Sequence, residues 1–113
     1  MSAAGGHPSD ADREAAALPV LEAAIAAARD RDAAALLAVY DDDAVWLADG
    51  ETVRGGAAAA ERHLAVATAA DGWADAQQHG ARAALRWSAG DARGAIVVEV
   101  RRGRIIFAAA ASG

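Results

Sequence analysis

The stretch Leu36-Leu37-Ala38-Val39-Tyr40-Asp41-Asp42-Asp43-Ala44-Val45-Trp46 contains the change from helix to strand that decides the fold. Its first residues continue a helical spacing of apolar side chains over residues 33–40. Three consecutive carboxylates then oppose the dipole at the helix C-terminus, and they predict a helix stop and a solvated loop. Residues 44–48 (AVWLA) predict a strand. A helix that leads directly into a strand favours a domain of the α+β class.

Upstream of this stretch, the chain predicts a longer helix that begins at Asp10. Pro19 cannot donate a backbone hydrogen bond, so this helix either starts near Leu18 or kinks there. Asp30 or Asp32 is expected to cap the short helix that follows. The apolar residues of the longer helix recur at spacings of three and four, which places them on one face. These residues are Leu18, Leu21, Ile25 and Ala28.

Downstream, Asp49-Gly50 predicts a hairpin turn, because glycine accepts the positive φ that such turns require. Residues 51–54 are the expected return strand, and Gly55-Gly56 breaks the chain. Residues 57–69 predict a third helix, followed by a loop over residues 70–75 that carries Trp73. The inward face of this third helix contains Ala60, His63, Leu64 and Ala67.

The last third of the chain predicts an antiparallel meander of strands over residues 79–88, 92–101 and 104–112. Turns at Ala89-Gly90-Asp91 and Arg102-Gly103 join these strands. Alternation divides the side chains into an apolar set and an arginine-rich set on the opposite face. The set expected to be apolar and inward contains His79, Ala81, Ala83, Leu85, Trp87, Ile96, Val98, Val100, Ile105, Phe107 and Ala109.

The composition leaves room for one small hydrophobic core. Of the 113 residues, 62 are hydrophobic and 37 of these are alanine, which leaves 25 larger apolar side chains. One compact domain over residues 10–113 is expected, preceded by a flexible leader over residues 1–9. The absence of cysteine excludes disulfides, thiolate metal sites and a cysteine nucleophile, and it is compatible with the reducing cytosol.

Charge is distributed unevenly along the chain, whose net charge is −5. Residues 1–75 carry 14 acidic and 5 basic side chains (−9), whereas residues 76–113 carry 2 and 6 (+4). The acidic and basic halves are expected to face each other, within one subunit or between two. Overall acidity argues against nucleic-acid binding, since phosphate contacts need a positive surface. Neither a signal peptide nor a membrane span is expected, because Pro19 and Glu22 interrupt the most apolar run.

The order helix, helix, short hairpin, helix and meander resembles the cone-shaped fold of nuclear transport factor 2 (NTF2), and within it the SnoaL-like domains. The matching pieces are the helix exit from Arg31-Asp32 to Val45, the hairpin from Asp49 to Gly55, and the run from Val98 to Ile105. The resemblance covers residues 10–112. It implies N-terminal helices packed on a curved antiparallel sheet. Because the segment 71–78 is too short and too polar for a full strand, the strand set is expected to be shortened and to expose an edge that a second subunit covers.

The resemblance also implies an apolar pocket between the concave face of the sheet and the first helices. Large aromatic and aliphatic linings suit a flat apolar ligand, and they suit a filled core equally well. Trp73 is expected to serve as a lid over the pocket or as an interface plug. The ligand-binding residues predicted on this basis are Tyr40, Trp46, His63, Trp73, Trp87, Val98 and Phe107.

Catalytic relatives such as ketosteroid isomerase place a carboxylate base, a tyrosine and a protonated acid at three positions of this fold. The corresponding positions in this chain are Ala48, Ala24 and Ile96, and none of these side chains can transfer a proton. Asp49 is one residue away from the base position, which turns its side chain to the opposite face. A histidine side chain can act as a general acid or base, but no carboxylate orients His79 in sequence. Asp49 and His79 are the remaining catalytic candidates.

No metal and no cofactor are expected. The side chains of Asp41, Asp42 and Asp43 diverge, whereas a hard cation needs about six oxygens that converge from several segments. The arginines at positions 82, 86 and 101 share one sheet face, where they could hold an anionic ligand or an acidic partner surface, or form a solvated face.

The sequence favours a cytoplasmic domain that binds a small apolar molecule as a homodimer formed through the sheet, and that need not catalyse a reaction. Neither a membrane nor a nucleic acid is an expected partner. One alternative is an isomerase, cyclase or hydrolase-type enzyme acting on a polyketide-like or terpenoid-like substrate, with His79 or Asp49 as base and Tyr40 or Trp46 as orienting groups. The other alternative is a dimerisation or regulatory module.

Overall fold

The computed structural model describes residues 17–48 and 50–112. The predicted leader, the predicted helix start at Asp10 and the side chain of Asp49 lie outside this part of the chain. Helices and strands follow one another in an order that agrees with the α+β prediction. The elements are α2 (Ala17–Arg29), α3 (Ala33–Ala38), β1 (Tyr40–Ala48), β2 (Glu51–Arg54), α4 (Gly56–Ala69), β3 (Gly72–His79), β4 (Arg82–Ala89), β5 (Ala92–Arg101) and β6 (Arg104–Ser112).

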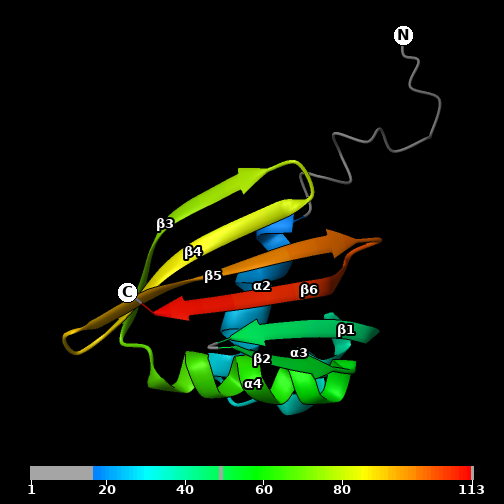
Figure 1. The fold of residues 1–113 in the computed structure, drawn as a ribbon, viewed down its shortest axis with the longest axis horizontal. Coiled ribbons are helices and arrows are strands. Elements are labelled where there is room, and N and C mark those ends of the chain that lie inside the picture. The colour runs from blue at the N-terminus through cyan, green and yellow to red at the C-terminus, as the bar shows by residue number, and fades with distance from the viewer. Residues whose placement is uncertain (1–16, 49, 113) are drawn as a thin grey trace, which may run out of the picture.

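The strands form one curved sheet with the order β2-β1-β6-β5-β4-β3, and the helices lie on one side of it (Figure 1). All neighbouring pairs are antiparallel except β1 and β6, which run parallel. The prediction of an antiparallel sheet is therefore wrong at this pair. A hairpin forces its strands to be antiparallel, but β1 and β6 are separated by β2, α4 and the whole meander, so their connection leaves the direction free.

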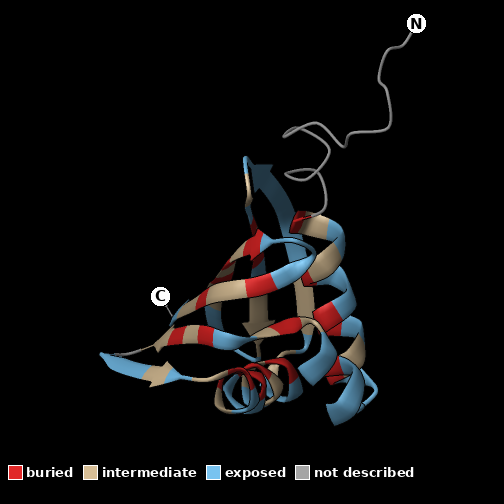
Figure 2. Cartoon of the chain, turned by 90° about the vertical axis from the view of Figure 1, so that its right-hand side faces the viewer, coloured by how far each residue is buried: buried red, intermediate tan, exposed pale blue. Residues whose placement is uncertain are grey.

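The core lies between the helices and the covered face of the sheet. In Figure 2 the buried positions alternate along the strands and recur on the helix sides that look toward the sheet. Leu21, Ile25 and Ala28 are buried as predicted, and Leu18 is half-buried. The larger side chains of the buried core are Leu21, Ile25, Leu36, Tyr40, Trp46, Leu85, Ile96, Val98, Val100 and Ile105.

The change from helix to strand comes earlier than predicted. Asp32 caps α3, since its Oδ1 accepts a hydrogen bond from the backbone N–H of Ala35 at 3.0 Å. The helix ends at Ala38 rather than at residue 40, and Tyr40 already pairs with Ile105 of β6. The loop predicted for the three carboxylates is wrong, because these residues belong to β1, where an irregularity in the pairing with β6 between Tyr40 and Val45 accompanies the exposure of Asp42 and Asp43.

The segment predicted to be too short and too polar for a strand is the eight-residue β3. This strand lies at the edge of the sheet and pairs only with β4, so most of its side chains remain in solvent and can be polar. Asp75 adopts a positive φ of 56°, and the register with β4 shifts between Ala74 and Gln77. The strand set is therefore not shortened, and Trp73 belongs to a strand rather than to a loop.

Gly56 holds the start of α4 against β1. A Cβ on this buried glycine would lie 2.5 Å from the backbone oxygen of Asp41. We expect Gly56→Ala to lower the free energy of unfolding by about 1–3 kcal/mol through this overlap, although alanine normally favours helix over glycine. Urea unfolding followed by circular dichroism measures the change.

Gly72→Ala is the matched control, because its Cβ would meet only the Ser88 Oγ at an ordinary 3.4 Å. Equal stability of the two variants would show that the contact between α4 and β1 is not tight.

Candidate functional site

A polar group lies in the otherwise apolar interior where α4 packs on β1. The Tyr40 hydroxyl lies 2.6 Å from His63 Nδ1, and the two rings meet edge to face with centroids 5.6 Å apart. The centroid of the Trp46 ring lies 6.1 Å from the centroid of the imidazole. All three side chains are almost completely buried.

Burial decides the protonation of this pair. It lowers the pKa of His63 to about 4 and raises the pKa of Tyr40 above its usual range, because each charged form would be desolvated. Both groups are therefore neutral at pH 7. We assign the phenol O–H as the donor to Nδ1, because the reverse arrangement would leave the phenol proton without an acceptor among the described residues. The imidazole proton then resides on Nε2, which is buried and has no hydrogen-bond partner among the described residues.

Four of the predicted ligand-binding residues form packed core rather than an open pocket. Tyr40, Trp46, His63 and Val98 have at most 1% of their surface exposed. Together with Ile96 they occupy the interior between β1, α4 and the middle of the sheet. The interior between the helices and the sheet is filled here, as the alternative interpretation of these residues allowed.

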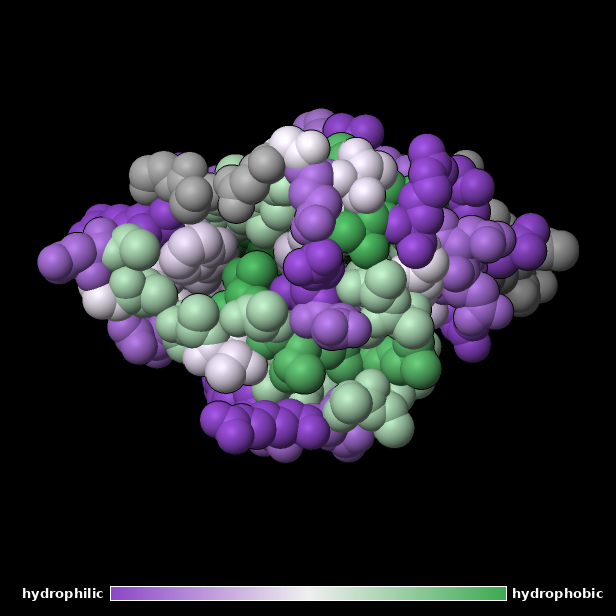
Figure 3. All heavy atoms as spheres, turned by 60° about the horizontal axis from the view of Figure 1, so that its bottom comes forward, coloured by the Kyte–Doolittle hydropathy of each residue, from purple (hydrophilic) through white to green (hydrophobic). Residues whose placement is uncertain are grey.

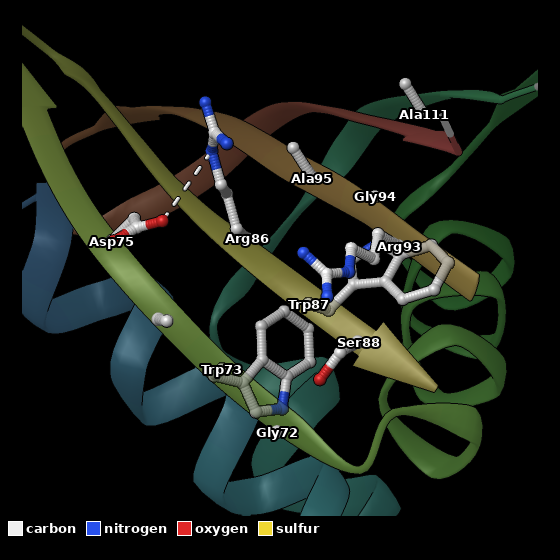
Figure 4. A pocket seen from close by; sticks show the side chains of 11 residues that line it. Gly72, Trp73, Asp75, Arg86, Trp87, Ser88, Arg93, Gly94, Ala95 and Ala111 are labelled. Atoms are coloured by element: carbon white, nitrogen blue, oxygen red, sulfur yellow. Dashed lines mark ion pairs between the residues drawn. The ribbon is translucent and has the colours of Figure 1, made fainter. Parts of the chain in front are cut away.

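The structure contains an open cleft of about 640 Å³ at one corner of the sheet. The start of β3, the end of β4, the start of β5 and the end of β6 meet there (Figure 4). Two of the predicted residues, Trp73 and Trp87, line this cleft. The other lining residues are Gly72, Ala74, Asp75, Arg86, Ser88, Arg93, Gly94, Ala95 and Ala111.

Strand pairing brings the two tryptophans together. Trp73 of β3 lies directly opposite Trp87 of β4, so both side chains leave the sheet on the side of Leu85. Trp87 lies opposite Gly94 of β5, and its indole passes over this glycine. A Cβ on Gly94 would overlap the indole and the backbone oxygen of Ala111. Gly94 therefore leaves free the space that the Trp87 ring occupies.

Charged side chains complete the cleft. The guanidinium of Arg86 lies 3.8 Å from the carboxylate of Asp75, and the two side chains point toward each other (Figure 4). Arg93 of β5 contributes a second guanidinium to the lining. A smaller cleft of about 360 Å³ lies between α2 and β3, and Trp73 lines both clefts. Trp73 thus borders both clefts.

Phe107 is not part of the interior, and its predicted inward orientation is wrong. The register between β5 and β6 shifts because Ile106 is an extra residue between Phe107 and Ile105. Ala108, rather than Phe107, lies opposite Val98 and beside Trp46. Phe107 lies opposite Glu99 and beside Val45, on the face of the sheet away from the helices.

Of the two catalytic candidates, the structure describes His79, which joins neither the cleft nor the buried pair. His79 is exposed at the end of β3, opposite Arg82, because the turn begins at Gly80. Its predicted inward position at the start of the next strand is therefore wrong. Asp49 is outside the described part of the chain.

The three positions of the ketosteroid isomerase pattern provide no acid or base. Ala24 and Ile96 are buried, and Ala48 is half-buried. Among residues 17–48 and 50–112, no three His, Asp or Glu side chains are grouped as a metal site would require. No helix in the same part of the chain is long and apolar enough to cross a membrane.

Reasoning from the sequence missed the polar lining of the corner cleft. Arg86 was assigned to the outer face, and Asp75 and Arg93 were given no role. The available signal was Gly94, since a glycine inside a strand often marks a close approach of another group.

The fold is that of known NTF2-like proteins, although no family model and no curated protein matches the sequence. An NTF2-like protein of unknown function from Mesorhizobium loti is 23% identical with a TM-score of 0.77, covering 95% of this chain and 97% of that one. An LEH-like epoxide hydrolase from M. tuberculosis is 22% identical with a TM-score of 0.68, covering 88% and 84%. A putative polyketide cyclase from Sinorhizobium meliloti is 20% identical with a TM-score of 0.68, covering 81% and 93%.

The chain therefore has the NTF2-like α+β fold. The helices pack on one side of a curved sheet, and the elements follow one another in the predicted order. Both observations confirm the fold that the resemblance implied. Identities of this size establish architecture alone, so the function has to be argued from the site.

The buried imidazole makes stability depend on pH. The pKa of His63 is about 4 in the folded protein and about 6.5 when unfolded, so the unfolded chain binds the extra proton between these values. The contribution of neutral His63 is complete above pH 6.5 and is lost as the pH falls toward 4. We expect a total loss of about 3 kcal/mol over this window, most of it measurable by urea unfolding between pH 7 and pH 5.

His63→Phe should flatten this part of the pH profile, whereas the control His79→Ala, at an exposed histidine, should leave it unchanged. A His63→Phe variant that keeps the wild-type slope between pH 7 and pH 5 would contradict the assignment.

Proposed function

We propose that this chain is a cytoplasmic NTF2-like domain that binds a small, flat, apolar molecule in the corner cleft, as part of a homodimer formed through the sheet. The observation that carries the proposal is the direct pairing of Trp73 and Trp87 in the wall of a 640 Å³ cleft. This volume lies within the range of about 300–1,000 Å³ that small-molecule sites occupy. Half-buried indoles that line one cleft favour planar ligands, because their faces stack on aromatic rings.

Binding accounts for the cleft better than catalysis does. Two of the similar structures are titled as an epoxide hydrolase and a putative polyketide cyclase, which keeps an enzymatic role as the second candidate. The cleft contains one carboxylate, Asp75, and this carboxylate faces a guanidinium. Histidine is absent from the lining of both clefts. A general acid–base pair of the kind that such reactions use is therefore not supported by the described residues.

The dimer is supported by the face of the sheet that the described helices leave uncovered. Alternation and pairing place apolar side chains in its centre, and Arg82 with Glu99 forms an ion pair of 3.1 Å at its border. A self-complementary pairing of this face would remove the apolar centre from water. Figure 3 shows another side of the molecule, that of α3 and α4, where hydrophilic side chains divide the apolar patches. The apolar centre of the uncovered face contains Val45, Leu47, Ala84, Val97, Phe107 and Ala109.

The ligand site can be tested with N-phenyl-1-naphthylamine, a neutral aromatic probe that fluoresces when it leaves water. We expect Trp73→Ala to weaken its binding about tenfold, because stacking on an aromatic side chain contributes about 1 kcal/mol in addition to apolar burial. Leu37→Ala is the control, since Leu37 is 44% exposed on α3 and lies outside both clefts. Equal probe affinity in both variants would place any binding elsewhere on the protein.

The dimer can be tested by sedimentation equilibrium at micromolar concentration. The wild-type chain should sediment with twice the mass of the 11.4 kDa monomer. Val97→Asp should yield monomers, because it places a charge in the centre of the uncovered face, whereas Leu37→Asp on α3 should not. A monomeric wild-type chain would refute the dimer.

A further inference from the structure

We propose that the ligand of the corner cleft is a planar aromatic acid whose carboxylate is bound by Arg86 and Arg93. This inference rests on the proposed ligand-binding function and adds the chemical class of the ligand. Two features of the cleft define that class, namely an aromatic wall and an excess of positive charge.

The aromatic wall selects a flat ring system. Trp73 and Trp87 come from neighbouring strands in direct register, so their side chains leave the sheet on the same side, and the Trp87 indole extends over Gly94 of β5. Gly94 lets the Trp87 ring lie close to the strand, since any side chain there would displace it. A flat ligand can use the remaining open space of the cleft, and a bulky or globular one would meet fewer ring faces.

The charge of the lining favours an anion. Arg86 and Arg93 are its cations, and Asp75 is its carboxylate, which gives a net charge of +1. The Arg86–Asp75 distance of 3.8 Å exceeds that of a direct hydrogen bond, and both side chains are more than 60% exposed. Such a pair contributes little to stability, so a ligand carboxylate can take the place of Asp75 on the guanidinium.

Both features line the same cleft. Alternation turns Trp73 and Trp87 toward the helix side of the sheet, and Arg86 and Arg93 toward the other side. The cleft is bordered by both sets because it lies at the corner where the strands end. A ligand with its ring at one end and its charge at the other fits this arrangement, as a ring carboxylic acid does.

The test compares three probes of the same ring size, 2-naphthoate, 2-naphthalenemethanol and 2-naphthylmethylamine. Binding is followed in 50 mM salt by NMR, using the indole N–H signals of the three tryptophans. We expect 2-naphthoate to bind at least tenfold more tightly than the alcohol, and the amine to bind least. The signals of Trp73 and Trp87 should shift more than that of the buried Trp46.

Variants assign the preference to the two arginines. The double variant Arg86→Ala, Arg93→Ala should bind 2-naphthoate no better than the alcohol, with the affinity for the alcohol unchanged. Arg101→Ala is the control, because this exposed arginine on β5 lies outside the cleft and should leave the preference intact. Circular dichroism checks that each variant is folded.

The outcomes separate the inference from the function on which it rests. If the alcohol and the acid bind equally, or if the amine binds best, the aromatic acid is refuted while ligand binding in the cleft stands. If the preference for the acid survives in the double variant, the assignment to Arg86 and Arg93 is refuted. If no probe shifts the Trp73 and Trp87 signals, the proposed function fails as well.

Discussion

The hydrogen bond between Tyr40 and His63 constrains the rest of the structure most strongly. It joins the first residue of β1 to the middle of α4 across 23 positions of sequence, inside a core that has few large side chains. Alanine fills the close contacts between helices and sheet. The larger side chains of Tyr40, Trp46 and His63 fill the space beside α4. Each polar atom placed there needs a partner, because an unpaired buried group costs about 1–3 kcal/mol. The short bond satisfies the phenol and one imidazole nitrogen in a single contact.

The packing of this buried pair determines where open space remains for a ligand. A fold that leaves its interior open needs other side chains to hold its helices apart, and 25 larger apolar residues do not supply them here. The interior is therefore closed around the buried pair, and the open space lies at the corner of the sheet, beyond the helices. The ends of the strands, rather than the interior, carry Trp73, Trp87 and the charged residues of the cleft. The outer face of the sheet has an apolar centre, and none of the helices in the described part of the chain covers it.

The sequence predicts the order of elements, the hairpin turns and most inward positions, because these depend on local periodicity and on glycine conformation. It does not predict the three register shifts between strands. One extra residue at Ile106 turns Phe107 outward, and the bulge at Asp75 lets a polar segment complete the sheet as β3. Such shifts depend on pairing with strands distant in sequence, which a single-strand pattern does not contain. The pocket predicted in the interior is filled, because aromatic residues that suit the lining of a pocket suit a packed core equally well.

The corner cleft and the uncovered sheet face cannot act independently. Arg86, Ala95 and Ala111 line the cleft, and alternation places their side chains on the same side of the sheet as Val97 and Phe107. A second subunit packed on that face would therefore stand beside the cleft and restrict its opening. A ligand that contacts both subunits binds the dimer more tightly than the monomer, and by linkage it also strengthens the dimer. A ligand that needs the space taken by the second subunit does the reverse. Arg86 lies at the border of both surfaces, so in such a dimer its guanidinium would be the group through which ligand charge and subunit contact affect each other.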